Sequence, residues 1–237
     1  MEALGENQTQ NRRAVIDVGS NSVKLLVAEV AEGKVRPLVH EGEQTRLGRG
    51  VFDSGKLDPE AIAQTAFVAG RFAEKARRMG AVEVKAVATS AAREARNGMD
   101  LIEAFREVNV PLAIIEGERE AELVLRGVRS QPDFADGPLA IIDVGGGSTE
   151  LLVADESGLR VQHSFPLGTV RLLEQHRPSD LPTAQERAQV IEALDQFLDD
   201  QVTPLLGSVT LPGTLVGAGG TPVFLSRILK ETDDLDS

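Results

Sequence analysis

The sequence predicts an α/β protein made of two related domains, each opened by a glycine-rich β-hairpin. Residues 140–154, AIIDVGGGSTELLVA, place an Asp, three glycines and a Ser between two short apolar runs that are typical of buried strands. Residues 14–28, AVIDVGSNSVKLLVA, match this segment at ten of fifteen positions when the chain is shifted by 126 residues. The motif-bearing hairpin is therefore duplicated within the chain.

The loops of both hairpins are suited to an anion. Glycine has no Cβ and tolerates positive φ, so the backbone N–H groups of such a loop can turn inward around a phosphate. A single glycine-rich hairpin can be only a turn, and Ser and Asn are ordinary turn residues. Two such hairpins with Asp and Ser in register favour phosphate binding. The predicted phosphate-binding residues of the two loops are Gly19, Ser20, Asn21, Ser22, Gly145, Gly146, Gly147, Ser148 and Thr149.

The layout of two Asp-x-Gly-x-x-Ser hairpins, one at the start of each half of the chain, resembles the actin-like ATPase fold. This resemblance implies two actin-like (ribonuclease H-like) domains with an active-site cleft between them. We expect a flexible tail over residues 1–12, domain I over residues 13–131 and domain II over residues 138–237. The segment between the domains, QPDFADGP, is rich in Pro, Gly and Asp and poor in apolar residues, as domain boundaries often are.

The composition of the 237-residue chain narrows the function classes. With 41% hydrophobic and 26% charged residues it is typical of a soluble globular protein, and no apolar run reaches the length of a membrane span. The absence of Cys excludes disulfides, thiolate catalysis and Cys-ligated zinc. The formal net charge of −12 argues against general nucleic-acid binding. We expect a cytoplasmic protein that binds neither membranes nor nucleic acids.

Strand and helix patterns alternate through domain I. A third strand over Lys34–Val39 follows the first hairpin, and Asp58 with Pro59 predicts the start of a helix that continues to about Met79. Residues 45–56, TRLGRGVFDSGK, carry three cations and three glycines, which fits either a mobile flap near the anion or a surface loop.

Two charged residues of domain I are candidates for catalysis. Arg93 follows the predicted strand Val84–Ala88, and open α/β sheets bind ligands at such strand ends. Glu120 falls in the first turn of a helix expected to start near Glu118, where the helix dipole favours a charged carboxylate that can act as a general base. The competing interpretations are an ordinary surface Arg and a solvated acidic helix face.

Domain II contains three further predicted elements. A strand is expected over Arg160–Phe165, and a long helix over Thr183–Val202 begins with a capping box formed by Thr183 and Glu186. A last short strand then enters a second glycine-rich turn over residues 217–221.

The two hairpins, with TSAAREA and EGEREAEL between them and VGAGGT after the second, make the chain resemble the exopolyphosphatase and guanosine pentaphosphate phosphatase (Ppx/GppA) family from about Arg13 to Arg227. This resemblance implies hydrolysis of terminal phosphoanhydride bonds in inorganic polyphosphate or in guanosine pentaphosphate, with Mg²⁺ or Mn²⁺. It implies that Glu120 is the catalytic base, that Asp143 and Glu150 organise the cation and the attacking water, and that Arg93 binds phosphate. Further candidates are Asp17 as a metal ligand and Gly219, Gly220 and Thr221 as phosphate-binding residues.

Two departures from the family pattern bear on activity. Arg119 stands where the family has a Glu, and it could lower the basicity of Glu120 or point away from it. Family members also usually continue for several tens of residues past the VGAGGT turn. We therefore expect a truncated domain II whose open surface, including residues 205–229, is covered in a homodimer.

Two alternative functions stay open on these residues. A sugar- or carboxylate-kinase-like phosphotransferase of the same fold, which uses ATP, would have similar phosphate loops. A non-catalytic protein that binds polyphosphate or guanosine phosphates would keep the loops without turnover.

Overall fold

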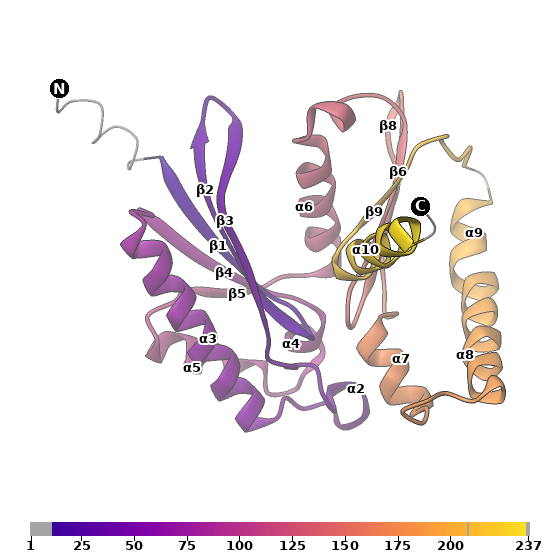
Figure 1. Cartoon of the computed structure of the whole chain (residues 1–237), viewed down its shortest axis with the longest axis horizontal. Helices are drawn as coiled ribbons and strands as arrows, with labels where there is room; N and C mark the ends of the chain where they lie inside the picture. Colours follow the sequence, from indigo (N-terminus) through magenta and orange to yellow (C-terminus); the bar gives the residue numbers. More distant parts are fainter. Residues whose placement is uncertain (1–10, 208, 236–237) are drawn as a thin grey trace. The chain divides into compact units, whose positions relative to one another are not determined.

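The computed structural model describes residues 11–207 and 209–235, with side chains described up to residue 230. Contacts divide the chain into two compact units, residues 1–116 and residues 117–237 (Figure 1). Of the expected N-terminal tail, residues 1–10 lie outside the described part, whereas Arg12 already begins a strand. No helix in the described ranges is long and apolar enough to cross a membrane.

Within the described residues, the first unit is built on a five-stranded mixed sheet. Its elements are β1 Arg12–Val18, β2 Ser22–Ala31, β3 Lys34–Gln44, α2 Val51–Ser54, α3 Pro59–Arg78, β4 Glu83–Ala88, α4 Ser90–Glu94, α5 Gly98–Glu107 and β5 Leu112–Ile114. The strand order is β3-β2-β1-β4-β5, with β1 antiparallel to β2 and parallel to β4. Helices α3 and α5 lie side by side and cover the sheet (Figure 1).

Helix α3 begins where the sequence predicts. The Asp58 carboxylate accepts the N–H groups of Glu60 at 2.8 Å and Ala61 at 3.1 Å. This cap satisfies two of the donors that a helix start leaves without a partner. The buried face of the helix, which includes Ala69 and Phe72, packs into the core of the first unit.

The second unit repeats the strand order of the first. Its elements are α6 Gly117–Arg129, a 3₁₀ turn Pro132–Phe134, β6 Leu139–Val144, β7 Thr149–Asp155, β8 Gly158–Phe165, α7 Thr169–His176, α8 Ala184–Phe197, a π-helical turn Leu198–Val202, α9 Thr203–Leu206, β9 Leu215–Ala218 and α10 Gly220–Leu235. The order β8-β7-β6-β9 corresponds to β3-β2-β1-β4, again with an antiparallel hairpin and a parallel fourth strand. The predicted duplication therefore extends from the hairpin to four strands of each sheet, and β5 of the first sheet has no counterpart among the described strands of the second.

Alternate residues of the second sheet face different helices. Ile141 and Leu152 pack with Ala121 of α6, whereas Leu151 and Val153 pack with Phe197 at the end of α8. This alternation follows from the two-residue period of a strand. One face of the hairpin β6–β7 is therefore covered by α6.

The division between the units differs from the predicted boundary. The Pro/Gly/Asp-rich segment 131–138 lies inside the second unit, and the division falls between Glu116 and Gly117. The reason is helix α6, because its apolar side chains, including Val124 and Leu125, pack on the second sheet. Glu120, expected in domain I, consequently belongs to the second unit.

Candidate functional site

The loop of the second hairpin, residues 145–148, offers three backbone N–H groups to a ligand. The N–H of Gly145 donates to the carbonyl of Ser148 at 3.0 Å and closes the turn. The N–H groups of Gly146, Gly147 and Ser148 have no acceptor among the described residues, although Gly147 and Ser148 are buried. Buried amides normally have a partner, and consecutive unpaired N–H groups form a concave anion-binding surface. This loop is therefore a strong candidate for a phosphate site.

The loop of the first hairpin has the same construction. Its turn is closed by the N–H of Gly19, which donates to the carbonyl of Ser22 at 3.0 Å, and the N–H groups of Ser20 and Asn21 find no acceptor in the described part of the chain. Gly19 and Gly145, both predicted to bind phosphate, thus use their N–H groups within the hairpin. They shape the loops, whereas the following amides are open to a ligand.

Residues 45–48 hold the first loop in place. The N–H groups of Thr45 and Arg46 donate to the carbonyl of Asn21 at 3.2 and 3.0 Å, and the N–H of Gly48 donates to the carbonyl of Ser20 at 2.7 Å. A Cβ at position 48 would lie 2.8 Å from the Cβ of Ser20, so only glycine permits this approach. Neither a mobile flap nor a plain surface loop describes this stretch, because it is packed against the candidate phosphate loop. The buried Thr45 hydroxyl has no partner among the described residues.

Asp143 and Glu150 form a cross-strand carboxylate pair. They lie opposite each other in the register of β6 and β7, so their side chains share the face of the sheet that α6 covers. Glu150 is only 2% exposed, and its Oε1 accepts a hydrogen bond from Oγ of Ser164 at 2.7 Å. No local pattern in the sequence marks Ser164, because its role depends on the pairing of β7 with β8.

The glycine-rich turn after β9 lies beside this carboxylate pair. Strand β9 runs parallel to β6 with Ala218 opposite Asp143, and Gly219 follows directly with a φ of +82°. The candidate phosphate-binding residues Gly219, Gly220 and Thr221 thus adjoin the carboxylate that was predicted to organise a cation.

The first hairpin carries a different charge pattern at the equivalent positions. A shift of 126 residues places Asp17 on Asp143 and Lys24 on Glu150. Lys24 Nζ lies 3.8 Å from Oδ2 of Asp17, and these side chains are 41% and 43% exposed. Burial raises the pKa of Asp17, while the charge of Lys24 lowers it. Asp17 therefore already has a cationic partner, unlike a typical metal ligand.

Two carboxylates are sufficient protein ligands for Mg²⁺. In the described ranges, no group of three or more His, Cys, Asp or Glu residues is arranged to hold an ion. Mg²⁺ commonly takes one or two protein carboxylates and completes its octahedral shell with water and substrate phosphates. Asp143 and Glu150 beside a phosphate loop fit this donor set.

Glu120 lies in the first turn of α6, on the helix that covers the face of Asp143 and Glu150. The neighbouring Arg119 forms an ion pair with Glu122, and this hydrogen bond is the main cause that lowers the pKa of Glu122. The guanidinium of Arg119 is thereby directed along the helix toward Glu122. Of the two expectations for Arg119, the structure supports orientation away from Glu120.

Arg93, the remaining predicted site residue, lies in the first unit. It is part of α4, directly after β4, and its Nη1 donates to the carbonyl of Ile115 at 2.9 Å. Ile115 is itself bonded through its N–H to the carbonyl of Ala88 at the end of β4. The guanidinium is therefore held at the strand ends where ligands usually bind in such sheets.

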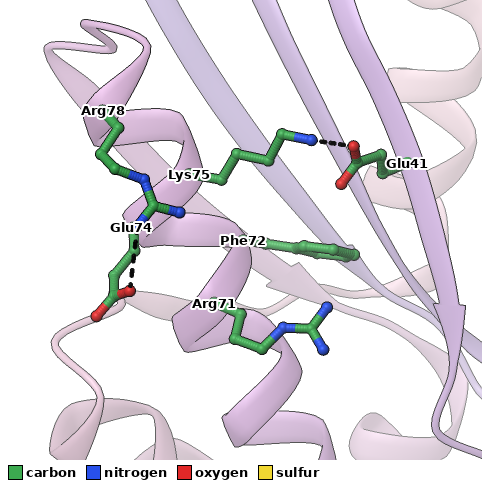
Figure 2. A pocket seen from close by; sticks show the side chains of 6 residues that line it. All are labelled: Glu41, Arg71, Phe72, Glu74, Lys75 and Arg78. Atoms are coloured by element: carbon green, nitrogen blue, oxygen red, sulfur yellow. Dashed lines mark hydrogen bonds and ion pairs between the residues drawn. The ribbon is translucent and has the colours of Figure 1, made fainter.

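A pocket of about 380 Å³ opens between α3 and β3 in the first unit, and none of the candidate site residues lines it. Figure 2 shows its lining side chains Glu41, Arg71, Phe72, Glu74, Lys75 and Arg78. Each cation of this lining has a carboxylate partner: Lys75 pairs with Glu41, Arg71 with Glu43 at 3.0 Å, and Arg78 with Glu74 at 3.9 Å. Its cations are thus already neutralised, which makes this pocket a poor candidate for a polyanion.

Comparison with known proteins agrees with the motif-based resemblance. The model of the Ppx/GppA phosphatase family matches residues 26–236. Exopolyphosphatase 2 of Mycobacterium tuberculosis (strain CDC 1551 / Oshkosh) is 34% identical over 239 residues, covering 95% of this chain and 73% of that protein. Guanosine-5'-triphosphate,3'-diphosphate pyrophosphatase of Vibrio cholerae (strain ATCC 39541 / Classical Ogawa 395 / O395) is 30% identical over 219 residues, covering 91% of this chain and 43% of that protein.

A solved structure extends the likeness to three dimensions. The crystal structure of an exopolyphosphatase from Cytophaga hutchinsonii superimposes with a TM-score of 0.85 at 28% sequence identity. The match covers 94% of this chain and 71% of that one. It confirms the actin-like α/β fold predicted from the two hairpins.

Proposed function

The chain belongs to the Ppx/GppA phosphatase family, and on this basis we propose that it hydrolyses the terminal phosphoanhydride bond of inorganic polyphosphate, of guanosine pentaphosphate, or of both. The relatives named exopolyphosphatase and guanosine pentaphosphate pyrophosphatase support both substrates. Both are chains of phosphoryl groups that carry a dense negative charge.

One observation carries the proposal within the second unit. Three consecutive amides of residues 146–148 lack an acceptor in the described part of the chain, and they adjoin the carboxylates of Asp143 and Glu150 across the same hairpin. Backbone N–H groups can bind phosphate oxygens, and neighbouring carboxylates can bind a divalent cation. The site therefore suits a phosphate substrate that binds together with such a cation. Hydrolysis of such a bond needs mainly positioning and charge neutralisation.

Asp143 and Glu150 would hold Mg²⁺ or Mn²⁺ in this proposal. When bound, such a cation neutralises charge on the phosphoryl oxygens and lowers the pKa of a bound water. The hydrogen bond from Ser164 holds Oε1 of Glu150 in a fixed position within the sheet. Asp17 is a weaker candidate for a metal ligand because of its pairing with Lys24.

Glu120 is proposed as the general base that orients and deprotonates the attacking water. Its place in the first turn of α6 favours the ionised form, which is the form that accepts a proton. Arg93 and the amides of Ser20 and Asn21 are proposed to bind phosphate groups, since each is a donor suited to phosphate oxygens.

Phosphate release tests the proposal directly. We expect release of inorganic phosphate from tripolyphosphate, longer polyphosphate or guanosine pentaphosphate in the presence of Mg²⁺. A kinase-like enzyme would instead form a phosphorylated acceptor from ATP, and a non-catalytic protein would bind these anions without release. Side-by-side kcat/KM values on polyphosphates of defined length and on guanosine pentaphosphate would identify the preferred substrate.

A cytoplasmic location and a homodimer complete the proposal. The Cys-free composition supports the location. The homodimer is supported by β9 and α10, where several large apolar side chains are exposed: Leu215, Val223, Phe224, Leu225, Ile228 and Leu229. Apolar surfaces of this kind are usually covered by another chain.

A further inference from the structure

We propose that Arg171, acting with the first turn of α7, is a positioning residue that aims the amides of the second phosphate loop at the substrate. This inference rests on the hydrolysis proposed above and assigns a part of it to a residue outside the predicted site. Arg171 is 8% exposed, which is unusual for an arginine, and Gly168 precedes α7 as its N-cap.

The first turn of α7 binds two carbonyls of the loop through its backbone. The N–H of Thr169 donates to the carbonyl of Gly145 at 3.1 Å. The N–H of Val170 and that of Arg171 both donate to the carbonyl of Gly146, at 2.8 and 3.1 Å. These donors are the ones that a helix N-terminus leaves without a partner inside the helix, so loop and helix satisfy each other.

The Arg171 side chain binds the third carbonyl. Its Nε donates to the carbonyl of Gly147 at 3.0 Å in a buried hydrogen bond. Together with the backbone bonds, this contact fixes three successive peptide groups of the loop from the side of α7.

Peptide planarity converts these contacts into an orientation of the amides. In a trans peptide the N–H of one residue points opposite to the carbonyl of the residue before it. Carbonyls of residues 145, 146 and 147 that face α7 therefore turn the N–H groups of Gly146, Gly147 and Ser148 away from α7. These are the three amides that have no acceptor among the described residues. By binding the Gly147 carbonyl, Arg171 fixes the orientation of the peptide group that contains the Ser148 N–H.

Gly168 allows the helix to come this close. A Cβ added at position 168 would overlap the Gly146 carbonyl oxygen and would lie 2.6 Å from the Gly147 nitrogen. The close contact is backbone against backbone, so no side chain can rotate out of the way. A larger residue at this position would displace the loop from its support.

The first hairpin shows that a buried arginine is not needed merely to support such a loop. There the carbonyls of Ser20 and Asn21 are bound by backbone N–H groups of residues 45–48, and no side-chain donor to them is present in the described residues. Burying a guanidinium costs free energy unless its hydrogen bonds compensate. At the second loop the guanidinium adds a side-chain hydrogen bond to the third carbonyl, that of Gly147, whereas in the first loop the equivalent carbonyl of Asn21 is bound by backbone N–H groups within the described residues.

The first experiment follows the amides by ¹⁵N-labelled NMR during titration with tripolyphosphate in the presence of Mg²⁺. In the wild-type protein we expect large shifts of the Gly146, Gly147 and Ser148 resonances. In Arg171→Met the Ser148 shift should be lost or much reduced, while the first-loop residue Asn21 still responds. Arg177→Met is the matched control, because Arg177 is an exposed arginine at the end of the same helix.

The second experiment measures hydrolysis by the same proteins. Arg171→Met should lower kcat by about 10- to 100-fold, as expected for one misdirected donor in an electrostatic site, with a smaller change in KM. Arg171→Lys keeps the charge but lacks the Nε–H, and its kcat should lie between those of wild type and Arg171→Met, more than twofold below wild type. Added guanidinium at non-denaturing concentration should raise kcat of Arg171→Met but not that of the control.

The outcomes separate this inference from the proposed function. If the wild type hydrolyses polyphosphate and a folded Arg171→Met or Arg171→Lys keeps its kcat within twofold and its Ser148 shift, the positioning role is wrong. Should Arg171→Met fail to fold, Arg171→Lys decides alone by the same two measurements. If the wild type releases no phosphate but its loop amides shift and the Ser148 shift depends on Arg171, the function is wrong and the positioning role stands.

Discussion

The carboxylate of Asp143 lies directly against Gly219, so that a Cβ at position 219 would overlap Oδ1 of Asp143. The φ of +82° at Gly219 adds strain for any other residue. We therefore predict that Gly219→Ala displaces the carboxylate, lowers kcat at least about tenfold and raises the Mg²⁺ concentration for half-maximal rate. Both quantities can be measured from hydrolysis rates at a series of Mg²⁺ concentrations. Gly213→Ala is the control, because a Cβ there meets no atom within 4 Å and no positive φ is involved.

The second prediction concerns Glu120 in the first turn of α6. Glu120→Gln preserves the size of the side chain but cannot accept a proton, so we expect kcat to fall by about 10²-fold or more with KM little changed. Glu118→Gln, one position before Arg119 and exposed, should keep nearly full activity. The reverse pattern would mean that the base is Glu118 and that the family motif is misaligned by two residues.

The third prediction is that activity requires a divalent cation held by the cross-strand pair. Excess EDTA should abolish hydrolysis, and Mg²⁺ or Mn²⁺ should restore it. Asp143→Asn and Glu150→Gln should each raise the cation concentration for half-maximal rate, because an amide oxygen is a poorer ligand for a hard cation than a carboxylate. Asp17→Asn should shift this concentration far less, since Lys24 already neutralises Asp17. Undiminished activity in excess EDTA would remove the metal from the mechanism.

The fourth prediction is an acid dependence of stability at the start of α8. The Glu186 carboxylate accepts the N–H of Thr183 at 2.7 Å and that of Ser179 at 3.1 Å, and these bonds lower its pKa from 4.5 to about 2. A lowered folded-state pKa stabilises the fold above pH 4.5, and this contribution is lost as the pH falls toward 2. Urea midpoints of the wild type and Glu186→Gln should therefore differ at pH 6, and the difference should shrink steadily below pH 4.5 and vanish only at about pH 2 and below. Glu192→Gln on the same helix should follow the wild type throughout.

The fifth prediction tests the exposed apolar surface of β9 and α10. Phe224 is 63% exposed on this surface, and Phe224→Glu should convert a homodimer into a monomer because it places a charge in an apolar contact. Size-exclusion chromatography with light scattering measures the mass. Phe67→Glu, at a similarly exposed position on α3, should leave the dimer intact. A wild-type protein that is already a stable monomer would contradict the homodimer.

Local patterns were sufficient to predict the hairpins and helix starts, because these depend on neighbouring residues. The Asp58 cap and the capping box of Thr183 and Glu186 are both present as predicted. The duplicated hairpin also predicted the repeated sheet, since the same strand pattern pairs in the same way. At the hairpins and helix caps, the residues that determine the structure lie within a few positions of one another in the sequence.

Features that depend on distant contacts could not be predicted in this way. The amphipathic pattern of α6 does not indicate which sheet its apolar face covers, and the contact-based division between the units lies earlier in the chain than the predicted boundary. Residues 45–48, Thr-Arg-Leu-Gly, follow neither a helix nor a strand pattern, and their bonds to the carbonyls of Ser20 and Asn21 could not be predicted from the sequence. Arg171 lies in the segment FPLGTVRLLE, which resembles the family, but the hydrogen bonds of Arg171 and Ser164 could not be predicted because each joins residues more than ten positions apart.

The contrast between Lys24 and Glu150 has a consequence for how the two copies of the hairpin have diverged. At one equivalent position the first copy carries its own counterion, whereas the second copy carries another acid. The first hairpin therefore pairs its Asp with a cation from the neighbouring strand. The second places two acids opposite each other, so a single lysine-to-glutamate difference between the twin hairpins replaces a cross-strand ion pair with the carboxylate pair that is proposed to hold a cation.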